Sequence, residues 1–131
     1  MKKEKNKGFS LVELIVVIAI MATLVGVLAP RYIQYIERAR RQTCYWNMDN
    51  VVGEVQLRAF SDPEFMKDLK NEAQNDGEVL DYIRTTNIDV PTCPSHGTYS
   101  LKFDVENRKL TMTCTMTVHN LPVEGGTTEG E

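Results

Sequence analysis

The sequence predicts an α+β fold, in which one long N-terminal helix packs on a small antiparallel sheet of two or three strands. Three observations predict it. The run from Phe9 to Ala29 is almost entirely apolar, and the chain then keeps apolar side chains at helical three- and four-residue spacing to about residue 60. Two later segments, 97–105 and 110–118, alternate apolar and polar residues as strands do. With 131 residues, the chain has room for one compact domain beside the apolar run.

The apolar run is long enough to be a membrane helix. As a helix, its 21 residues span about 32 Å, close to the roughly 30 Å of a bilayer core. A secretory signal peptide has a shorter apolar region of roughly 7–15 residues, and here Pro30 follows the nearest small-residue site. We therefore expect a retained helix from about Ser10 to about Phe60, with a bend near Pro30.

Charge is distributed unevenly around this run. Residues 1–8 hold four lysines and one glutamate, a formal charge of +3, which leaves −6 for the rest of a chain whose total is −3. An acidic body argues against a general nucleic-acid surface, which would be basic. One local exception is a group of four arginines just beyond the run: Arg31, Arg38, Arg40 and Arg41. We interpret them as lying at lipid headgroups, with a polyanion-binding patch as the alternative.

Glu13 is the unusual residue of the apolar run. A carboxylate at a bilayer centre costs about 2.5–3.5 kcal/mol, and less near the end of a span. One interpretation is that Glu13 reaches back to the membrane interface. The other is that it needs a cationic partner, either a leader lysine or a new α-amino group made by cutting before Phe9.

The segment Lys7-Gly8-Phe9-Ser10-Leu11-Val12-Glu13-Leu14, followed by an apolar helix, resembles the prepilin motif of type IV pilins and type II secretion pseudopilins. The resemblance extends from Met1 to about Arg41, and Pro30 stands where pilins often carry a helix-kinking proline. It implies a pilin-like fold. A prepilin peptidase would cleave between Gly8 and Phe9 and N-methylate Phe9.

The same resemblance implies a domain organisation. Residues 1–8 would be a basic leader that is removed, and 9–30 a transmembrane helix that becomes the filament core. Residues 31–124 would form the soluble domain. The polar, glycine-rich and acidic composition of residues 125–131 predicts a flexible tail.

The implied function is that of a structural subunit of a type IV pilus or pseudopilus. Glu13 would neutralise the Phe9 amine of a neighbouring subunit, and the subunit would wait in the membrane with its N-terminus in the cytoplasm before joining an extracellular filament or pseudopilus. Implied partners are other copies and related pilins, prepilin peptidase, membrane lipid, an inner-membrane assembly platform and an assembly ATPase. The alternatives are a competence DNA-uptake pseudopilus and a membrane-anchored binding module that does not polymerise, with DNA as the weaker candidate ligand.

Local signals organise the soluble part. Asp62 is positioned to cap a short helix that starts at Pro63 and runs to about Gln74, and residues 78–84 share a helical face. A turn at 106–109 joins the two alternating segments into a hairpin. Two strands alone are marginal, so we expect the hairpin to pack on the helix, with room for a third short strand.

Three cysteines, Cys44, Cys93 and Cys114, allow one disulfide and a free thiol, or an intermolecular bond. A Cys93–Cys114 bridge would enclose 20 residues and contribute about 3 kcal/mol, and pairings with Cys44 and the absence of any bond stay open. The Cys-Pro…Gly…Tyr run that begins at Cys93 also resembles Gram-positive pilin-like proteins. A zinc site with His96 and His119 is the rival, because Cys-x2-His and Cys-x4-His have zinc-like spacing. We expect no metal, because an oxidising exterior favours the disulfide.

No nucleophile triad, phosphate loop, dinucleotide fingerprint or zinc-protease motif is visible in the sequence, so we expect neither an enzyme nor a cofactor. A group of aromatic residues follows the apolar run: Tyr32, Tyr35, Tyr45 and Trp46. We interpret it as an interfacial belt, with a stacking platform for DNA as the alternative.

Overall fold

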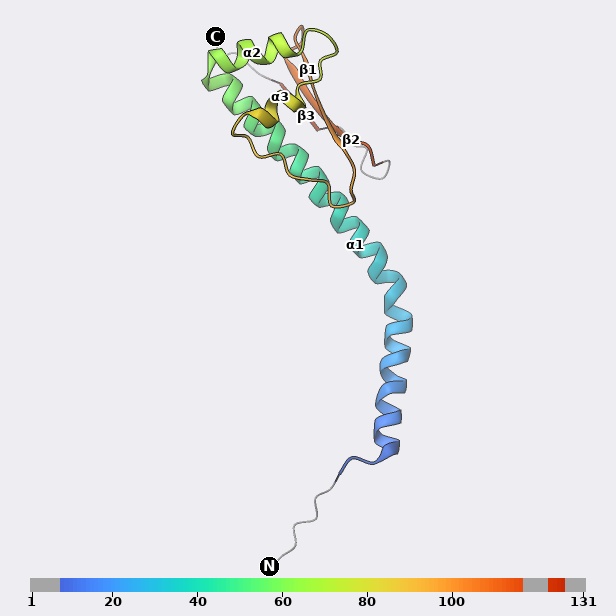
Figure 1. The fold of residues 1–131 in the computed structure, drawn as a ribbon. Helices are drawn as coiled ribbons and strands as arrows, with labels where there is room; N and C mark the ends of the chain where they lie inside the picture. Colours follow the sequence, from blue (N-terminus) through green and yellow to red (C-terminus); the bar gives the residue numbers. More distant parts are fainter. Residues whose placement is uncertain (1–7, 117–122, 127–131) are drawn as a thin grey trace, which may run out of the picture. The chain divides into compact units, whose positions relative to one another are not determined.

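The computed structural model describes residues 8–116 and 123–126 (Figure 1). The chain forms two units that divide between Glu37 and Arg38, and each is described by itself. In chain order the elements are α1 (Leu11–Ser61), α2 (Pro63–Glu72), α3 (Leu80–Thr85), β1 (Tyr99–Asp104), β2 (Lys109–Cys114) and β3 (Val123–Gly126). The predicted α+β fold, a long N-terminal helix with a small antiparallel sheet, is confirmed.

The first unit consists of the start of α1 and the short segment before it. The helix begins one residue after the predicted start and runs through Pro30 without interruption. Every side chain from Gly8 to Tyr35 is exposed within the chain. Among the described residues, α1 is the one helix long and apolar enough to cross a membrane, with a mean hydropathy of 2.8 over its most apolar 18 residues.

In the second unit, the later part of α1 buries one face. The buried residues of the predicted stripe recur at three- and four-residue spacing: Cys44, Met48, Val51, Val55 and Ala59. Val52, which was not predicted, is buried beside them. They join one hydrophobic core with the inward side chains of the sheet, among which Leu101, Leu110 and Met112 are fully buried. The helix stripe and the sheet therefore bury each other's apolar surface, which neither could do alone.

The sheet has the order β1-β2-β3, and both pairs are antiparallel. In the hairpin, Tyr99 is opposite Cys114 and Asp104 is opposite Lys109. The Asp104 carboxylate accepts hydrogen bonds from the amides of Glu106 and Asn107, at 3.0 and 3.1 Å, and so closes the turn. The predicted hairpin is confirmed, although β2 ends at Cys114, earlier than expected.

Strand β3 corrects one predicted boundary. Gly125 and Gly126, which we expected to begin a flexible tail at 125–131, pair with Leu110 and Lys109 of β2 instead. A Cβ atom on Gly125 would lie only 2.6 Å from Val52 Cγ1 of α1. The glycine thus lets the strand lie flat against the helix. Residues 127–131 of the predicted tail lie outside the described part of the chain.

The outer edge of β1 is covered by the segment that leads into α3. The Val79 amide donates to the Leu101 carbonyl at 2.8 Å, and the Phe103 amide donates to the Gly77 carbonyl at 2.7 Å. The carboxylate of Glu78 accepts a hydrogen bond from the Leu101 amide at 3.0 Å and another from the Ser100 hydroxyl. This segment closes an edge that would otherwise expose unpaired backbone groups.

The two short helices begin and end close to the predicted positions. The Asp62 carboxylate accepts from the amides of Glu64 and Phe65, at 3.0 and 3.2 Å, with Pro63 as the first helical residue. Helix α2 ends at Glu72, two residues before the predicted end. Helix α3 occupies Leu80–Thr85, within one or two residues of the predicted segment.

Candidate functional site

The predicted processing site lies in an open stretch of chain before α1. Residues 8–10 have no regular secondary structure, and the Phe9 side chain is 94% exposed. A Cβ atom on Gly8 would meet nothing within 4 Å in this chain. A peptidase can therefore reach the Gly8–Phe9 bond without unwinding the helix. Cleavage and methylation at these two residues stay predictions.

Glu13 and Ser10 form a reciprocal pair at the start of α1. The Ser10 amide donates to Glu13 Oε2 at 2.9 Å, and the Glu13 amide donates to Ser10 Oγ at 3.3 Å. This is the capping box Ser-x-x-Glu, in which each side chain satisfies a backbone donor of the helix terminus. Our sequence reasoning missed this role, although the three-residue spacing of Ser10 and Glu13 is its usual signal.

The other predicted residues of α1, in the first unit and at the start of the second, have exposed side chains. Pro30 lies inside α1 and is exposed, as are the four arginines. The aromatic residues proposed as a belt are all at the surface, with exposures from 38% for Tyr45 to 73% for Tyr35. Their exposure is compatible with an interfacial belt and with a stacking platform for DNA, and both interpretations stay predictions.

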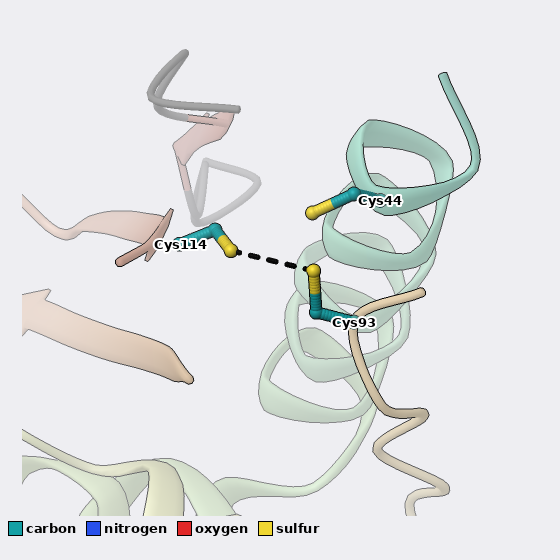
Figure 2. Close-up of side chains that lie close together, drawn as sticks. All are labelled: Cys44, Cys93 and Cys114. Carbon is teal, nitrogen blue, oxygen red and sulfur yellow. Dashed lines mark hydrogen bonds between the residues drawn. The ribbon is translucent and has the colours of Figure 1, made fainter. Parts of the chain in front are cut away.

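The three cysteines come together in the core of the second unit. Cys44 is on α1, Cys93 is on the segment between α3 and β1, and Cys114 ends β2 (Figure 2). All three side chains are buried, and their Sγ atoms lie within 4.8 Å of one another. The Sγ atoms of Cys93 and Cys114 are 3.7 Å apart. The structure thus gathers all three candidates, and the predicted Cys93–Cys114 disulfide stays a prediction.

The surroundings of this thiol cluster (Cys44, Cys93 and Cys114) are tight. The Tyr99 hydroxyl donates to Cys44 Sγ at 3.6 Å, and burial raises the pKa of the Cys44 thiol to about 12. Burial also raises the pKa of Tyr99. The thiol and the phenol are therefore both neutral at neutral pH unless a cation is present.

The turn between Cys93 and β1 shapes one wall of the cluster. The His96 amide donates to the Cys93 carbonyl at 3.0 Å, and His96 has a φ of 60°. A Cβ atom on Gly97 would lie 2.6 Å from Cys114 Sγ and 3.3 Å from Cys93 Sγ. Only a glycine fits at that position without displacing a thiol.

The histidines of the rival zinc pattern do not join this group in the described part of the chain. Among the described residues, the one group of three or more potential metal ligands consists of the three cysteines. His96 is therefore not brought to it, and His119 lies outside the described residues.

Comparison with known proteins adds one finding. Residues 3–29, about a fifth of the chain, match the family model described as the prokaryotic N-terminal methylation motif. No curated protein and no solved structure gives a significant match. The matched segment covers the predicted cleavage site, Glu13 and the exposed apolar part of α1. This motif stands at the start of a long helix that carries a small antiparallel sheet, and the N-terminal part of the chain is therefore similar to type IV pilins and pseudopilins.

Proposed function

We propose that this chain is a structural, non-enzymatic subunit of a type IV pilus or related pseudopilus. In this proposal it polymerises through residues 9–30 after its leader, residues 1–8, is removed. The observation that carries the proposal is the coincidence of the methylation motif with an apolar part of α1, residues 11–35, whose side chains are all exposed.

The exposed apolar surface at the start of α1 is unfavourable in water. Burying one Leu, Ile or Val side chain stabilises by about 1.5–3 kcal/mol, and the first unit exposes a long series of them from Leu11 to Leu28. A bilayer covers such a surface in the unassembled subunit, and neighbouring helices cover it in a filament. The same sequence therefore suits both states.

Glu13 supports the same proposal. An unpaired carboxylate is expensive away from water, whereas a paired one is tolerated. Its capping bond from Ser10 satisfies part of its acceptor capacity, and a carboxylate can accept more than one donor. Cleavage before Phe9 creates an ammonium group, which is the cation that Glu13 would neutralise on a neighbouring subunit. A pairing that forms only at one axial stagger also fixes the register of the filament.

The location follows from the same processing step. A cytoplasmic leader places the N-terminus inside and the second unit outside the membrane, first at the membrane surface and then on the filament. The partners are other copies and related pilins, prepilin peptidase, lipid before assembly, and the platform and ATPase that drive assembly. We place the competence pseudopilus within this class, as one system in which such a subunit acts.

Two substitutions at Glu13 test the pairing. Glu13→Gln keeps a side-chain acceptor for the capping box but removes the charge, and Glu13→Ala removes both. We expect both variants to insert in the membrane and both to lose filaments, as measured by electron microscopy of sheared cell-surface material and by fractionation. Glu106→Gln is the matched control, because it removes a carboxylate charge from an exposed side chain in the turn between β1 and β2, outside residues 9–30, and it should assemble normally.

The results separate the alternatives. Filaments of normal length from Glu13→Gln would show that the charge pairing is wrong. Mass spectrometry of the mature N-terminus tests processing, and the expected product begins with an N-methylated phenylalanine at position 9. A native chain that keeps its leader and stays monomeric would favour the membrane-anchored binding module.

A further inference from the structure

We propose that Cys44, Cys93 and Cys114 are three ligands of one metal site inside the soluble domain, and that the ion is Zn²⁺. This inference goes beyond filament assembly, because the site lies in the core of the second unit and not in the N-terminal motif. It replaces our expectation of a disulfide with a chemistry that uses all three sulfur atoms.

The separation of the sulfur atoms fits a shared ion. A Zn–S bond of about 2.3 Å in a tetrahedral site places two sulfur ligands about 3.8 Å apart. The Sγ atoms of Cys93 and Cys114 are 3.7 Å apart, and all three Sγ atoms lie within 4.8 Å of one another. A disulfide needs a separation of about 2.05 Å. The three atoms are thus already near the spacing that one zinc ion requires.

The number of thiols is the second argument. A disulfide would use two of them and leave the third buried beside the bond. Figure 2 shows the three side chains converging from three different segments, with Cys44 on the helix, Cys114 at the sheet and Cys93 on the connecting chain. A single ion would join all three segments, whereas a Cys93–Cys114 bond would leave α1 unattached.

The surroundings suit an ion held by thiolates. All three cysteines are buried, at 0%, 4% and 4% exposure, so bulk water is excluded from the sulfur atoms. The Tyr99 hydroxyl donates to Cys44 Sγ, a contact that orients a metal-bound thiolate and offsets its charge. Gly97 lies against two of the sulfur atoms, where a side chain would close the space.

The binding step balances without any redox partner. Zn²⁺ replaces the three thiol protons, which pass to solvent, and three Zn–S bonds form. Three cysteines fill three tetrahedral positions, and the fourth belongs to a ligand outside this group. Zinc accepts thiolate ligands readily, and because the ion would join three segments of the buried core, the site would be structural.

The test measures metal and thiols on the full chain, purified from membranes in detergent without reducing agent. We expect one zinc ion per chain by elemental analysis, and three thiols that react with a thiol reagent only after denaturation with a chelator. Cobalt substituted for zinc should give the intense absorption of sulfur-to-cobalt charge transfer. A chain without zinc that shows one thiol and one disulfide would overturn the proposal, and so would three reactive thiols without metal.

Substitutions separate the metal from the disulfide. Cys44→Ser should reduce the zinc content to background in the metal case, but it would leave a Cys93–Cys114 bond intact. Met48→Leu, a buried change of similar volume one turn along the same helix face, is the control and should keep its zinc. A Cys44→Ser chain that retains one zinc ion would contradict the proposal. The measurement on the unsubstituted chain stands even if that variant does not fold, and it does not depend on filament assembly.

Discussion

Replacing Glu78 by alanine tests how the soluble domain closes its sheet. The Glu78 carboxylate accepts hydrogen bonds from the Leu101 amide at 3.0 Å, from the Ser100 hydroxyl and, more weakly, from the Leu80 amide at 3.4 Å. A hydrogen bond to a charged group contributes about 1.5–3 kcal/mol net, and a buried donor left unsatisfied costs about 1–3 kcal/mol. Leu101 is fully buried, so its amide would lose a partner that water cannot easily replace.

Because Glu78 is itself half-buried, we take the low end of the second range, about 1 kcal/mol, for each of the two strong bonds. The expected loss is about 2 kcal/mol in the free energy of unfolding, which lowers the Tm of a 60–100-residue domain by about 8–16 °C. Glu78→Gln keeps one acceptor oxygen and should lose about half as much. Near-UV circular dichroism of the full chain in detergent follows the melting of the domain through its aromatic side chains.

Glu106→Ala is the matched control, because the side chain is exposed and its hairpin bond comes from the backbone amide. We expect it to change stability by less than about 0.5 kcal/mol. If Glu78→Ala melts at the same temperature as Glu106→Ala, the carboxylate does not hold the edge of β1, and the reasoning is refuted.

Three further changes test other contacts by the same melting assay. Gly97→Ala should lower the free energy of unfolding by about 1–3 kcal/mol, because its Cβ atom would lie 2.6 Å from Cys114 Sγ. Unchanged stability would mean that the turn moves to make room for the methyl group. Asp62→Ala should lower the free energy of unfolding by about 1 kcal/mol, because it removes the cap of α2, whereas Asp62→Asn should keep most of the stability of the unsubstituted chain. Equal losses in the two variants would show that the effect does not come from the cap. The Glu124 carboxylate lies 2.6 Å from Lys109 Nζ, but both side chains are about half exposed. Glu124→Ala should therefore change the free energy of unfolding by less than about 1 kcal/mol. A larger loss would show that the ion pair is shielded from water.

Local patterns were sufficient to predict the long helix, the hairpin and the cap of α2. Each depends on residues close in sequence, such as the alternation along β1 or the Asp62-Pro63 pair. The pairing of Gly77–Val79 with the outer edge of β1 was not predictable from local sequence, because it depends on which strand lies beside this segment. A third short strand was allowed for, but its position at Val123–Gly126 was not predicted, since its Val-Glu-Gly-Gly sequence has low strand propensity and its pairing with β2 supplies the stability.

The candidate sites also differ in whether their residues are close together or far apart in the sequence. The residues of the N-terminal motif lie close together in the sequence, so the resemblance predicts Gly8, Phe9 and Glu13 as a group, and their roles stay predictions. The cysteines are 49 and 21 positions apart, and spacing alone could not decide whether two or three of them meet. The helix stripe and the alternation of β2 indicated that Cys44 and Cys114 face inward, but only the fold shows Cys93 beside both.

The position of β3 has a consequence for the timing of export. This strand is the last described element, and it covers one hydrogen-bonding edge of the central strand β2. If the domain crosses the membrane as an extended chain, β2 keeps that edge open until residues 123–126 emerge. A ribosome or translocase that stalls before this point would hold a half-closed sheet, which is competent to pair with a strand from another molecule.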